Sequence, residues 1–227
     1  MADNPFTLDG PRAAPASGGP AESLVILLHG LGADGNDLIS LAPELARLLP
    51  SAAFVSPHAP FPCDMAPLGR QWFSLQDQTP TAILAGVRLV APILDGFIDD
   101  ELARHGLSDQ RVALAGFSQG TMMALYVALR RARPLAGVLG YSGALIGAAE
   151  LTGELKSRPP VLLIHGDADE VVPFPAMAAA QAALQAADVP VRAERRPGLG
   201  HGIDPQGLGF GAAFLVEQLT AEAAASP

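Results

Sequence analysis

A chain of 227 residues is long enough to bury a sizeable hydrophobic core and is most simply one domain. Hydrophobic residues make up 49% of it and charged residues 16%, a balance typical of globular rather than disordered proteins. The formal net charge of −9 argues against binding to nucleic acid or anionic lipid through a basic face.

Three further features of the sequence bear on where the protein works. No segment approaches the roughly 18 consecutive apolar residues of a membrane span, so stable insertion into a membrane is not expected. The N-terminus lacks a basic start followed by an apolar stretch, so no secretory signal is predicted. Cys63 is the only cysteine, which rules out an internal disulfide and a thiolate zinc cluster. We expect a soluble, cytoplasmic protein.

The first part of the chain predicts a lead-in, two strands and a helix. Residues 1–22 are rich in Gly, Pro, Ala and Ser and are expected to be irregular, and residues 23–227 are expected to form a single domain. The apolar run "SLVILLHGLG" (23–32) predicts a strand buried on both faces. Apolar residues at helical spacing follow over 36–49, and "AAFVSPHAP" (52–60) predicts a second strand.

The middle of the chain predicts a long helix, a strand and a second helix. Residues 81–105 form an amphipathic stretch in which Pro92 should kink or split the helix. The run "RVALAGFSQG" (111–120) predicts a strand that ends at Ser118. The helix expected over 119–131 is apolar on more than one side, so we expect it to be deeply buried.

The last part of the chain continues this alternation. Apolar runs at 135–143 and 159–173 predict two more buried strands, and helices are expected over 175–187 and 205–222. The segment "VRAERRPGLGHG" (191–202) alternates in polarity and is more polar than the other strands. We therefore expect its strand to lie near an edge of the sheet.

Strands that alternate with helices indicate parallel β-α-β units. The predicted fold is α/β, with a mostly parallel central sheet and helices on both of its faces. In such sheets, functional sites form beyond the carboxyl ends of the strands. The polar, glycine-containing motifs of this sequence all follow predicted strands, so they are expected to meet at that end.

The stretch "GFSQG" places Ser118 between Gly116 and Gly120 and fits the pattern G-x-S-x-G. A strand precedes it and a helix follows, which is the context required of a nucleophile elbow. Glycines are needed there because the sharp turn brings neighbouring backbones too close for a Cβ atom. The alternative is an ordinary serine that caps the following helix.

A serine nucleophile needs a histidine base that is oriented by a carboxylate. In α/β-hydrolases the chain order is serine, then acid, then histidine. His201 lies in a glycine-rich loop after the last strand, whereas His165 closes a strand end, so the order selects His201. The acid is then Asp167 or Asp169. We favour Asp169, which lies further beyond the strand, because Asp167 is well placed to stabilise the turn.

Acyl transfer also needs N–H donors for the oxyanion. One is the backbone N–H of Gln119, which follows the nucleophile. The second is expected from the loop "HGLGADGND", where Gly30 and Gly32 allow close approach of the backbone, so Leu31 N–H is the predicted donor. A phosphate-binding loop is a rival reading of this segment, but the Lys and Ser/Thr of a P-loop are missing.

Taken together, these residues resemble one known family. The stretches "LLHGLGADGNDL", "PHAP", "QWFSL", "GFSQG", "HGDADEVVP" and "GHGI" resemble the phospholipase/carboxylesterase group of α/β-hydrolases, in the family's order and over residues 23–217. That group includes bacterial carboxylesterases and acyl-protein thioesterases. The resemblance implies an α/β-hydrolase fold without a large lid domain, no cofactor, and as a family-level expectation a homodimer.

The resemblance also implies roles for residues of this chain. Ser118 would be the nucleophile, His201 the base and Asp169 the orienting acid, with Leu31 and Gln119 as oxyanion donors.

Substrate-binding residues are predicted in the segment that the family uses to flank its acyl pocket. These are Trp72 and Phe73, for which core packing is the alternative, and Met65, for which it is loop packing. Residues 62–70, "PCDMAPLGR", depart from the thioesterases, so substrate preference stays open. Cys63 in this stretch is expected to be inert packing.

The predicted function is a serine carboxylesterase that hydrolyses small-molecule or lipid acyl esters through an acyl-enzyme on Ser118. A thioesterase or lysophospholipase that removes long acyl chains is the alternative within this class. A catalytically silent α/β-hydrolase that serves as a binding module is the alternative from another class.

Overall fold

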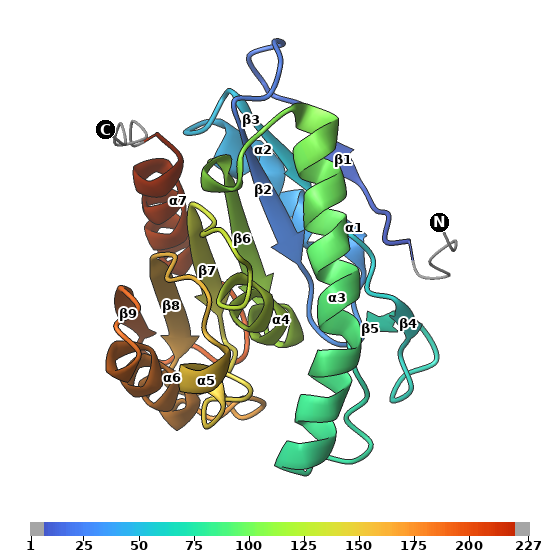
Figure 1. Cartoon of the computed structure of the whole chain (residues 1–227), viewed down its shortest axis with the longest axis vertical. Coiled ribbons are helices and arrows are strands. Elements are labelled where there is room, and N and C mark those ends of the chain that lie inside the picture. Colours follow the sequence, from blue (N-terminus) through green and yellow to red (C-terminus); the bar gives the residue numbers. More distant parts are fainter. Residues whose placement is uncertain (1–6, 221–227) are drawn as a thin grey trace.

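A seven-stranded sheet lies at the centre of the computed structural model, which describes residues 7–220 (Figure 1). The strand order is β1-β3-β2-β6-β7-β8-β9, and only β1 runs antiparallel to its neighbour. The strands are β1 (Arg12–Ala13), β2 (Ser23–Leu28), β3 (Ala52–Val55), β6 (Val112–Phe117), β7 (Gly137–Tyr141), β8 (Val161–Gly166) and β9 (Val191–Arg196). The predicted, mostly parallel sheet is confirmed.

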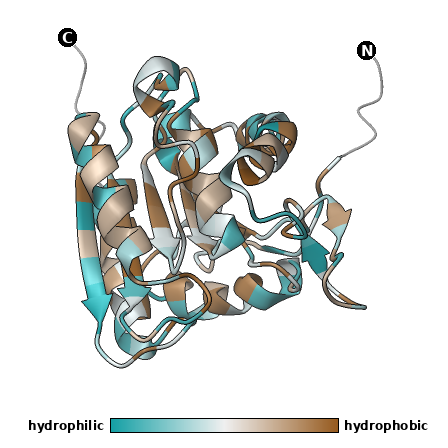
Figure 2. Cartoon of the chain, turned by 90° about the horizontal axis from the view of Figure 1, so that it is seen from below, coloured by the Kyte–Doolittle hydropathy of each residue, from teal (hydrophilic) through white to brown (hydrophobic). Residues whose placement is uncertain are grey.

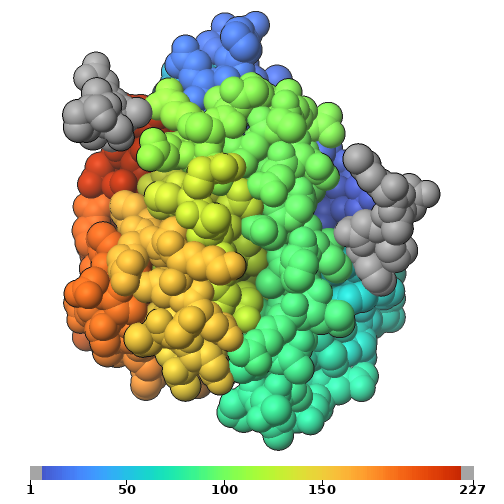
Figure 3. Space-filling view, in the orientation of Figure 1, coloured from blue at the N-terminus to red at the C-terminus, as the bar shows by residue number. Residues whose placement is uncertain are grey.

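Helices cover both faces of this sheet, as expected (Figure 2). They are α1 (Gly35–Leu38), α2 (Ala42–Ala46), α3 (Pro80–His105), α4 (Gln119–Ala128), α5 (Leu151–Glu154), α6 (Pro175–Ala186) and α7 (Pro205–Thr220). One core cluster packs α3, α4 and α6 on one face, and a second packs α1, α2 and α7 on the other. Figure 3 shows α3 running along the first face, beside the segment that follows β7.

The burial of the strands follows their composition. Every residue of β2, β3, β7 and β8 is buried, because parallel strands are covered by helices on both faces. Strand β9 lies at the edge of the sheet, where Arg192 and Arg195 are exposed and Glu194 is half-buried. Its ribbon is largely teal in Figure 2. The predicted edge position of this strand is confirmed.

Two expectations for the first part of the chain need correction. The lead-in over residues 1–22 is not irregular throughout, because β1 pairs with β3; residues 1–6 lie outside the described residues. The helix expected over 36–49 is broken into α1, a 3-10 turn η1 (Ile39–Leu41) and α2. Pro43 lies in the first turn of α2, where a missing N–H is tolerated. Because proline cannot donate the i→i−4 hydrogen bond, one continuous helix through this position is disfavoured.

The long helix α3 is continuous through Pro92, so the predicted split is wrong. The side chain of Thr79 caps its start, and Gly106 ends it in the left-handed region with φ of 65°. Its length and composition alone would suit a membrane span, with a mean hydropathy of 1.7 over its best window. One face of α3 packs against the core cluster, and helices in the cores of soluble proteins can have the same length and hydropathy.

Further elements were also not predicted from the sequence. They are the hairpin of β4 (Phe61–Pro62) and β5 (Arg70–Gln71), the 3-10 turn η2 (Asp109–Arg111) and the short helix α5. Helix α4 is also shorter than expected, and the last two residues of the helix expected over 205–222 lie outside the described residues. The hairpin matters most, because it lies next to the loop after β2.

Candidate active site

The candidate site lies at the carboxyl end of β6, the central strand of the sheet. The chain leaves β2 to form β3 on one side and returns later to form β6 on the other, so the strand order reverses between β2 and β6. Such a switch point leaves a crevice in which open α/β sheets bind ligands. Ser118 follows β6 and Leu31 follows β2, so the topology brings the predicted nucleophile and oxyanion loop together.

The backbone at Ser118 has the conformation expected of a nucleophile elbow. Ser118 has φ of 54° and ψ of −118°, a region that non-glycine residues rarely occupy. A Cβ at Gly116 would lie 2.4 Å from the Thr121 nitrogen, and one at Gly120 would lie 1.8 Å from the Leu28 carbonyl oxygen. Both flanking glycines are therefore required by the packing of the turn.

The two predicted oxyanion donors lie beside this turn. A Cβ at Gly30 would lie 3.3 Å from the Ser118 Cβ, which places the loop after β2 directly against the serine. Within residues 7–220, neither the Leu31 nor the Gln119 backbone N–H has a hydrogen-bond partner. Gln119 is also the first residue of α4, so its N–H carries the partial positive charge of a helix start.

Asp169, not Asp167, contacts the predicted base. The Nδ1 of His201 lies 2.8 Å from Asp169 Oδ2, and Asp169 Oδ1 accepts from the N–H groups of Val171 and Val172, each at 2.9 Å. Burial alone would raise the pKa of this carboxyl. The hydrogen bonds from His201, Val172 and Val171 outweigh burial, so the pKa of Asp169 lies below its usual value.

These contacts determine which nitrogen of His201 holds the proton. An ionised carboxylate can only accept, so Nδ1–H donates to Asp169 and the lone pair of Nε2 is left free for a proton. The His201 ring packs against the ring of Phe117, with 4.7 Å between centroids. Because Phe117 directly precedes Ser118, the predicted base lies near the turn that carries the predicted nucleophile. The described residues show no hydrogen bond between Ser118 and His201, a contact that often closes only with substrate.

The loop that holds His201 must travel back from the edge strand β9 to the centre of the sheet. It crosses the end of β8 at Gly166, where a Cβ would lie 2.1 Å from the Leu199 carbonyl oxygen. Asp167 secures this crossing: it accepts from Gly198 N–H at 2.6 Å and pairs with Arg195. Asp167 thus stabilises a turn, as the sequence suggested, and it does so by contacts with the end of β9 and the loop that follows it.

His165 has a closer relation to the site than its position at a strand end suggested. Its Nε2 lies 2.8 Å from the Val172 carbonyl oxygen and 3.2 Å from Asp169 Oδ2. Because a carbonyl accepts, Nε2 carries the hydrogen and donates it to Val172, with the carboxylate oxygen beside this bond. The same carboxylate oxygen therefore faces His165 on one side and His201 on the other.

The three residues predicted to bind substrate fall in two different environments. Trp72 and Phe73 are buried, and the side chain of Gln119 holds both: its Oε1 accepts from Trp72 N–H and its Nε2 donates to the Phe73 carbonyl. Met65 is 54% exposed in the loop of the β4–β5 hairpin, which also carries the half-buried Cys63. Substrate contact by these side chains stays a prediction.

Sequence reasoning missed two residues that support the predicted oxyanion loop. His29 is fully buried; its Nδ1–H donates to the Gly30 carbonyl at 2.7 Å and its Nε2 accepts from Ala59 N–H at 3.0 Å. Arg70 bonds through its backbone to Gly32 and Ala33. His29 could have been noticed as the histidine of the motif "HGLG", but the pairing of Arg70 has no local signal.

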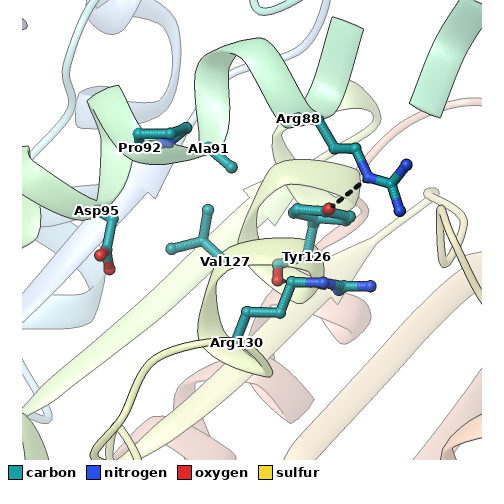
Figure 4. Close-up of a pocket in the computed structure, with 7 residues that line it drawn as sticks. All are labelled: Arg88, Ala91, Pro92, Asp95, Tyr126, Val127 and Arg130. Carbon is teal, nitrogen blue, oxygen red and sulfur yellow. Dashed lines mark hydrogen bonds between the residues drawn. The ribbon is translucent and has the colours of Figure 1, made fainter. Parts of the chain in front are cut away.

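Another pocket, of about 280 Å³, lies between α3 and α4 (Figure 4). There Arg88 Nε donates to the hydroxyl of Tyr126 at 3.4 Å, and the Arg130 guanidinium lies 3.7 Å from the centre of its ring. Both arginines pair with Glu154, which offsets one of their two positive charges. This pocket lacks a nucleophile with a base and is not the candidate site.

A metal site is likewise not evident in the part of the chain that the structure describes. No three His, Cys, Asp or Glu side chains gather there in a way suited to a metal ion.

Comparison with known proteins gives consistent results. The family described as Phospholipase/Carboxylesterase matches residues 13–219. The chain is 31% identical to Esterase YpfH of Escherichia coli (strain K12), over 84% of this chain and 81% of that protein. It is 28% identical to Acyl-protein thioesterase 1 of Gibberella zeae, over 86% of this chain and 90% of that protein. The crystal structure of esterase PE8 superposes with a TM-score of 0.90, at 42% identity over 94% of this chain and all of that one.

Proposed function

Because the chain belongs to the phospholipase/carboxylesterase family and is a carboxylic ester hydrolase, we propose that it is a serine carboxylesterase with Ser118 as its nucleophile. The observation that carries this proposal is the contact of Asp169 with His201, next to the strained turn at Ser118. Asp169 and His201 come from loops two and three strands away from β6, and chance packing would not bring them there in the order that the mechanism needs.

The chemistry follows from the free lone pair of His201 Nε2. Nε2 takes the proton of the Ser118 hydroxyl while the hydroxyl oxygen of Ser118 attacks the ester carbonyl carbon. The imidazolium that forms is stabilised by Asp169. The proton then passes to the leaving alcohol oxygen, the C–O bond breaks and an acyl-enzyme remains. Water attacks this acyl group with the same base, which releases the acid and restores Ser118.

The negative charge that develops on the carbonyl oxygen needs fixed donors. We assign this role to the unpaired N–H groups of Leu31 and Gln119, which flank Ser118 from β2 and from the start of α4. Loss of one such donor in other serine hydrolases costs about 100- to 1000-fold in rate. His29 and Arg70 act here as positioning residues, because they hold the loop that carries Leu31.

The decisive variant is Ser118→Ala. Without the nucleophile, we expect hydrolysis of ethyl acetate to fall at least about 1000-fold while the protein stays folded. Ser108→Ala is the matched control, since Ser108 is exposed at the opposite end of β6 and should keep full activity. Circular dichroism and thermal unfolding check the fold. Wild-type rates for folded Ser118→Ala would refute the mechanism.

The alternative activities are separated by simple measurements. Removal of long acyl chains is favoured by the similarity to a protein named acyl-protein thioesterase. It predicts faster reaction with long-chain acyl thioesters than with short-chain esters. A silent binding module predicts that a fluorophosphonate probe leaves Ser118 unlabelled in folded protein, whereas the esterase proposal predicts labelling of Ser118 alone.

A further inference from the structure

An apolar groove begins beside the candidate site and runs along α7. Its first part, of about 210 Å³, is lined by Asp37, Leu38, Ser40, Leu41, Phe117 and Ile203. Its second part, of about 440 Å³, lies between α2 and α7 and shares Leu41 and Ile203 with the first. The far end is open, since Leu48 is 58% exposed.

The near end of the groove lies beside Phe117, whose ring packs against the predicted base His201. Phe117 forms part of its wall, and the ring of Phe117 lies 4.7 Å from the ring of His201. Ile203, on the other wall, follows His201 by two residues. A chain that lies in the groove therefore reaches the site from the side of His201.

This approach decides which half of an ester would occupy the groove. The carbonyl oxygen must point to the N–H groups of Leu31 and Gln119, and the leaving oxygen must lie within reach of His201, which returns the proton. The substituent on the leaving oxygen therefore lies nearest to Phe117 and Ile203. Given the proposed serine esterase mechanism, we propose that the groove binds the alkyl chain of the alcohol half of the substrate.

The charges at the rim restrict the class of alcohol. The groove is lined by the carboxylates of Asp37, Glu44 and Asp204, of which Glu44 pairs with Arg47 at 3.0 Å and Asp204 with Arg196 at 2.7 Å. A phosphate on the alcohol would meet these carboxylates, and the chain as a whole has a net charge of −9. The fitting substrate is therefore an ester of an alkyl alcohol that carries no phosphate. The stretch of α7 from Pro205 to Ala212 spans about 10 Å, enough for a medium-length chain.

Gly209 offers a way to fill the groove without disturbing the fold. It lines the second part of the groove within α7, and a Cβ built on it meets no atom within 4 Å. Leucine at this position would therefore project into open groove. Gly96 in α3 is a matched control: it is also an exposed helical glycine with open space around it, and it lies on the opposite face of the sheet.

The test measures kcat/KM for acetate esters of alcohols from ethanol to octanol. In the wild type we expect a rise of about two- to fourfold for each methylene until the groove is full. Gly209→Leu should remove this rise, and Gly209→Ala should reduce it less. Gly96→Leu should keep the wild-type rise. Methyl esters of longer acids should react equally with Gly209→Leu and the wild type.

Three outcomes would overturn the proposal. They are a flat alcohol series in the wild type, an unchanged rise in folded Gly209→Leu, or a loss confined to the acyl series, which would place the acid half in the groove. Failure of the groove is distinguishable from failure of the esterase mechanism. If Ser118→Ala is inactive and Gly209→Leu behaves as wild type, only the groove proposal fails. If Ser118→Ala is active, the mechanism itself is wrong.

Discussion

At the scale of single residues, Asp169 is the most constrained side chain of the candidate site. One carboxylate oxygen accepts from the backbone of Val171 and Val172, and the other faces both His201 and His165. The polar Nε2–H of His165, 3.2 Å from that second oxygen, partly offsets its charge and weakens its attraction for a charged His201 ring. We therefore propose that His165 is a positioning residue that adjusts the predicted base through the predicted acid.

This arrangement predicts a change in pH dependence when His165 is replaced. In His165→Leu the donor is lost, the carboxylate stabilises the protonated base more strongly, and the acid limb of the kcat/KM profile should move up by about half a pH unit to one unit. His165→Gln, whose amide can still donate, should restore the wild-type profile. Lower activity in both variants with an unmoved profile would show that His165 has only a structural role.

At the scale of elements, the turn between β6 and α4 depends on two backbone contacts. Strand β2 runs beside β6, and its Leu28 carbonyl lies where a side chain at position 120 would begin. The hydroxyl of Thr121 bonds to the carbonyls of Gly116 and Tyr141 and ties the helix start to two strands. The strained φ of Ser118 persists because strand, turn and helix are all held by their neighbours.

Gly120→Ala tests this dependence. The added methyl would lie 1.8 Å from the Leu28 carbonyl oxygen, so backbone must shift, and we expect a loss of about 2–4 kcal/mol in the free energy of unfolding. Gly96→Ala meets no atom within 4 Å and should instead gain about 0.4–1 kcal/mol. Urea unfolding compares the two variants. Equal stability of Gly120→Ala and wild type would contradict the steric account.

At the scale of the whole molecule, stability depends on buried polar residues whose hydrogen bonds require a particular protonation state. Burial lowers the pKa of His29 below its usual value, since its Nε2 must accept from Ala59 N–H and so must stay unprotonated. The unfolded chain protonates His29 more readily than the folded one. Its contribution to stability is full above pH 6.5 and is lost as the pH falls through the lower folded value.

We therefore expect the free energy of unfolding, measured from pH 6.5 down to about pH 4, to decline as the pH falls, by at most about 1.4 kcal/mol for each pH unit per proton bound. The buried carboxylates of Asp169 and Asp109 have lowered pKa values, so they lose their contributions only below 3.8, outside this window. In His29→Gln the decline should be absent, at a lower overall stability. An equal slope in His29→Gln and wild type would assign the pH dependence to another group.

Much of the fold could be predicted because its signals are local. The buried strands are continuous apolar runs, and the elbow needs glycines directly beside Ser118, so neighbouring residues carry both signals. The hairpin of β4 and β5 and the break before α2 were missed for the opposite reason. Each strand of the hairpin has two residues, and its pairing is stabilised by contacts of Arg70 with the distant loop after β2.

By itself, the sequence determined the α/β architecture, the chain order of serine, acid and histidine, and the family to which these motifs belong. The sequence left both Asp167 and Asp169 as candidates for the acid that contacts His201. It also did not reveal that Trp72 is buried or that a groove runs beside Phe117. Those features depend on where the loop after β9 returns over Gly166 and on how α7 lies beside α2. Such distances join residues far apart in the chain, so only the packing of the whole structure sets them.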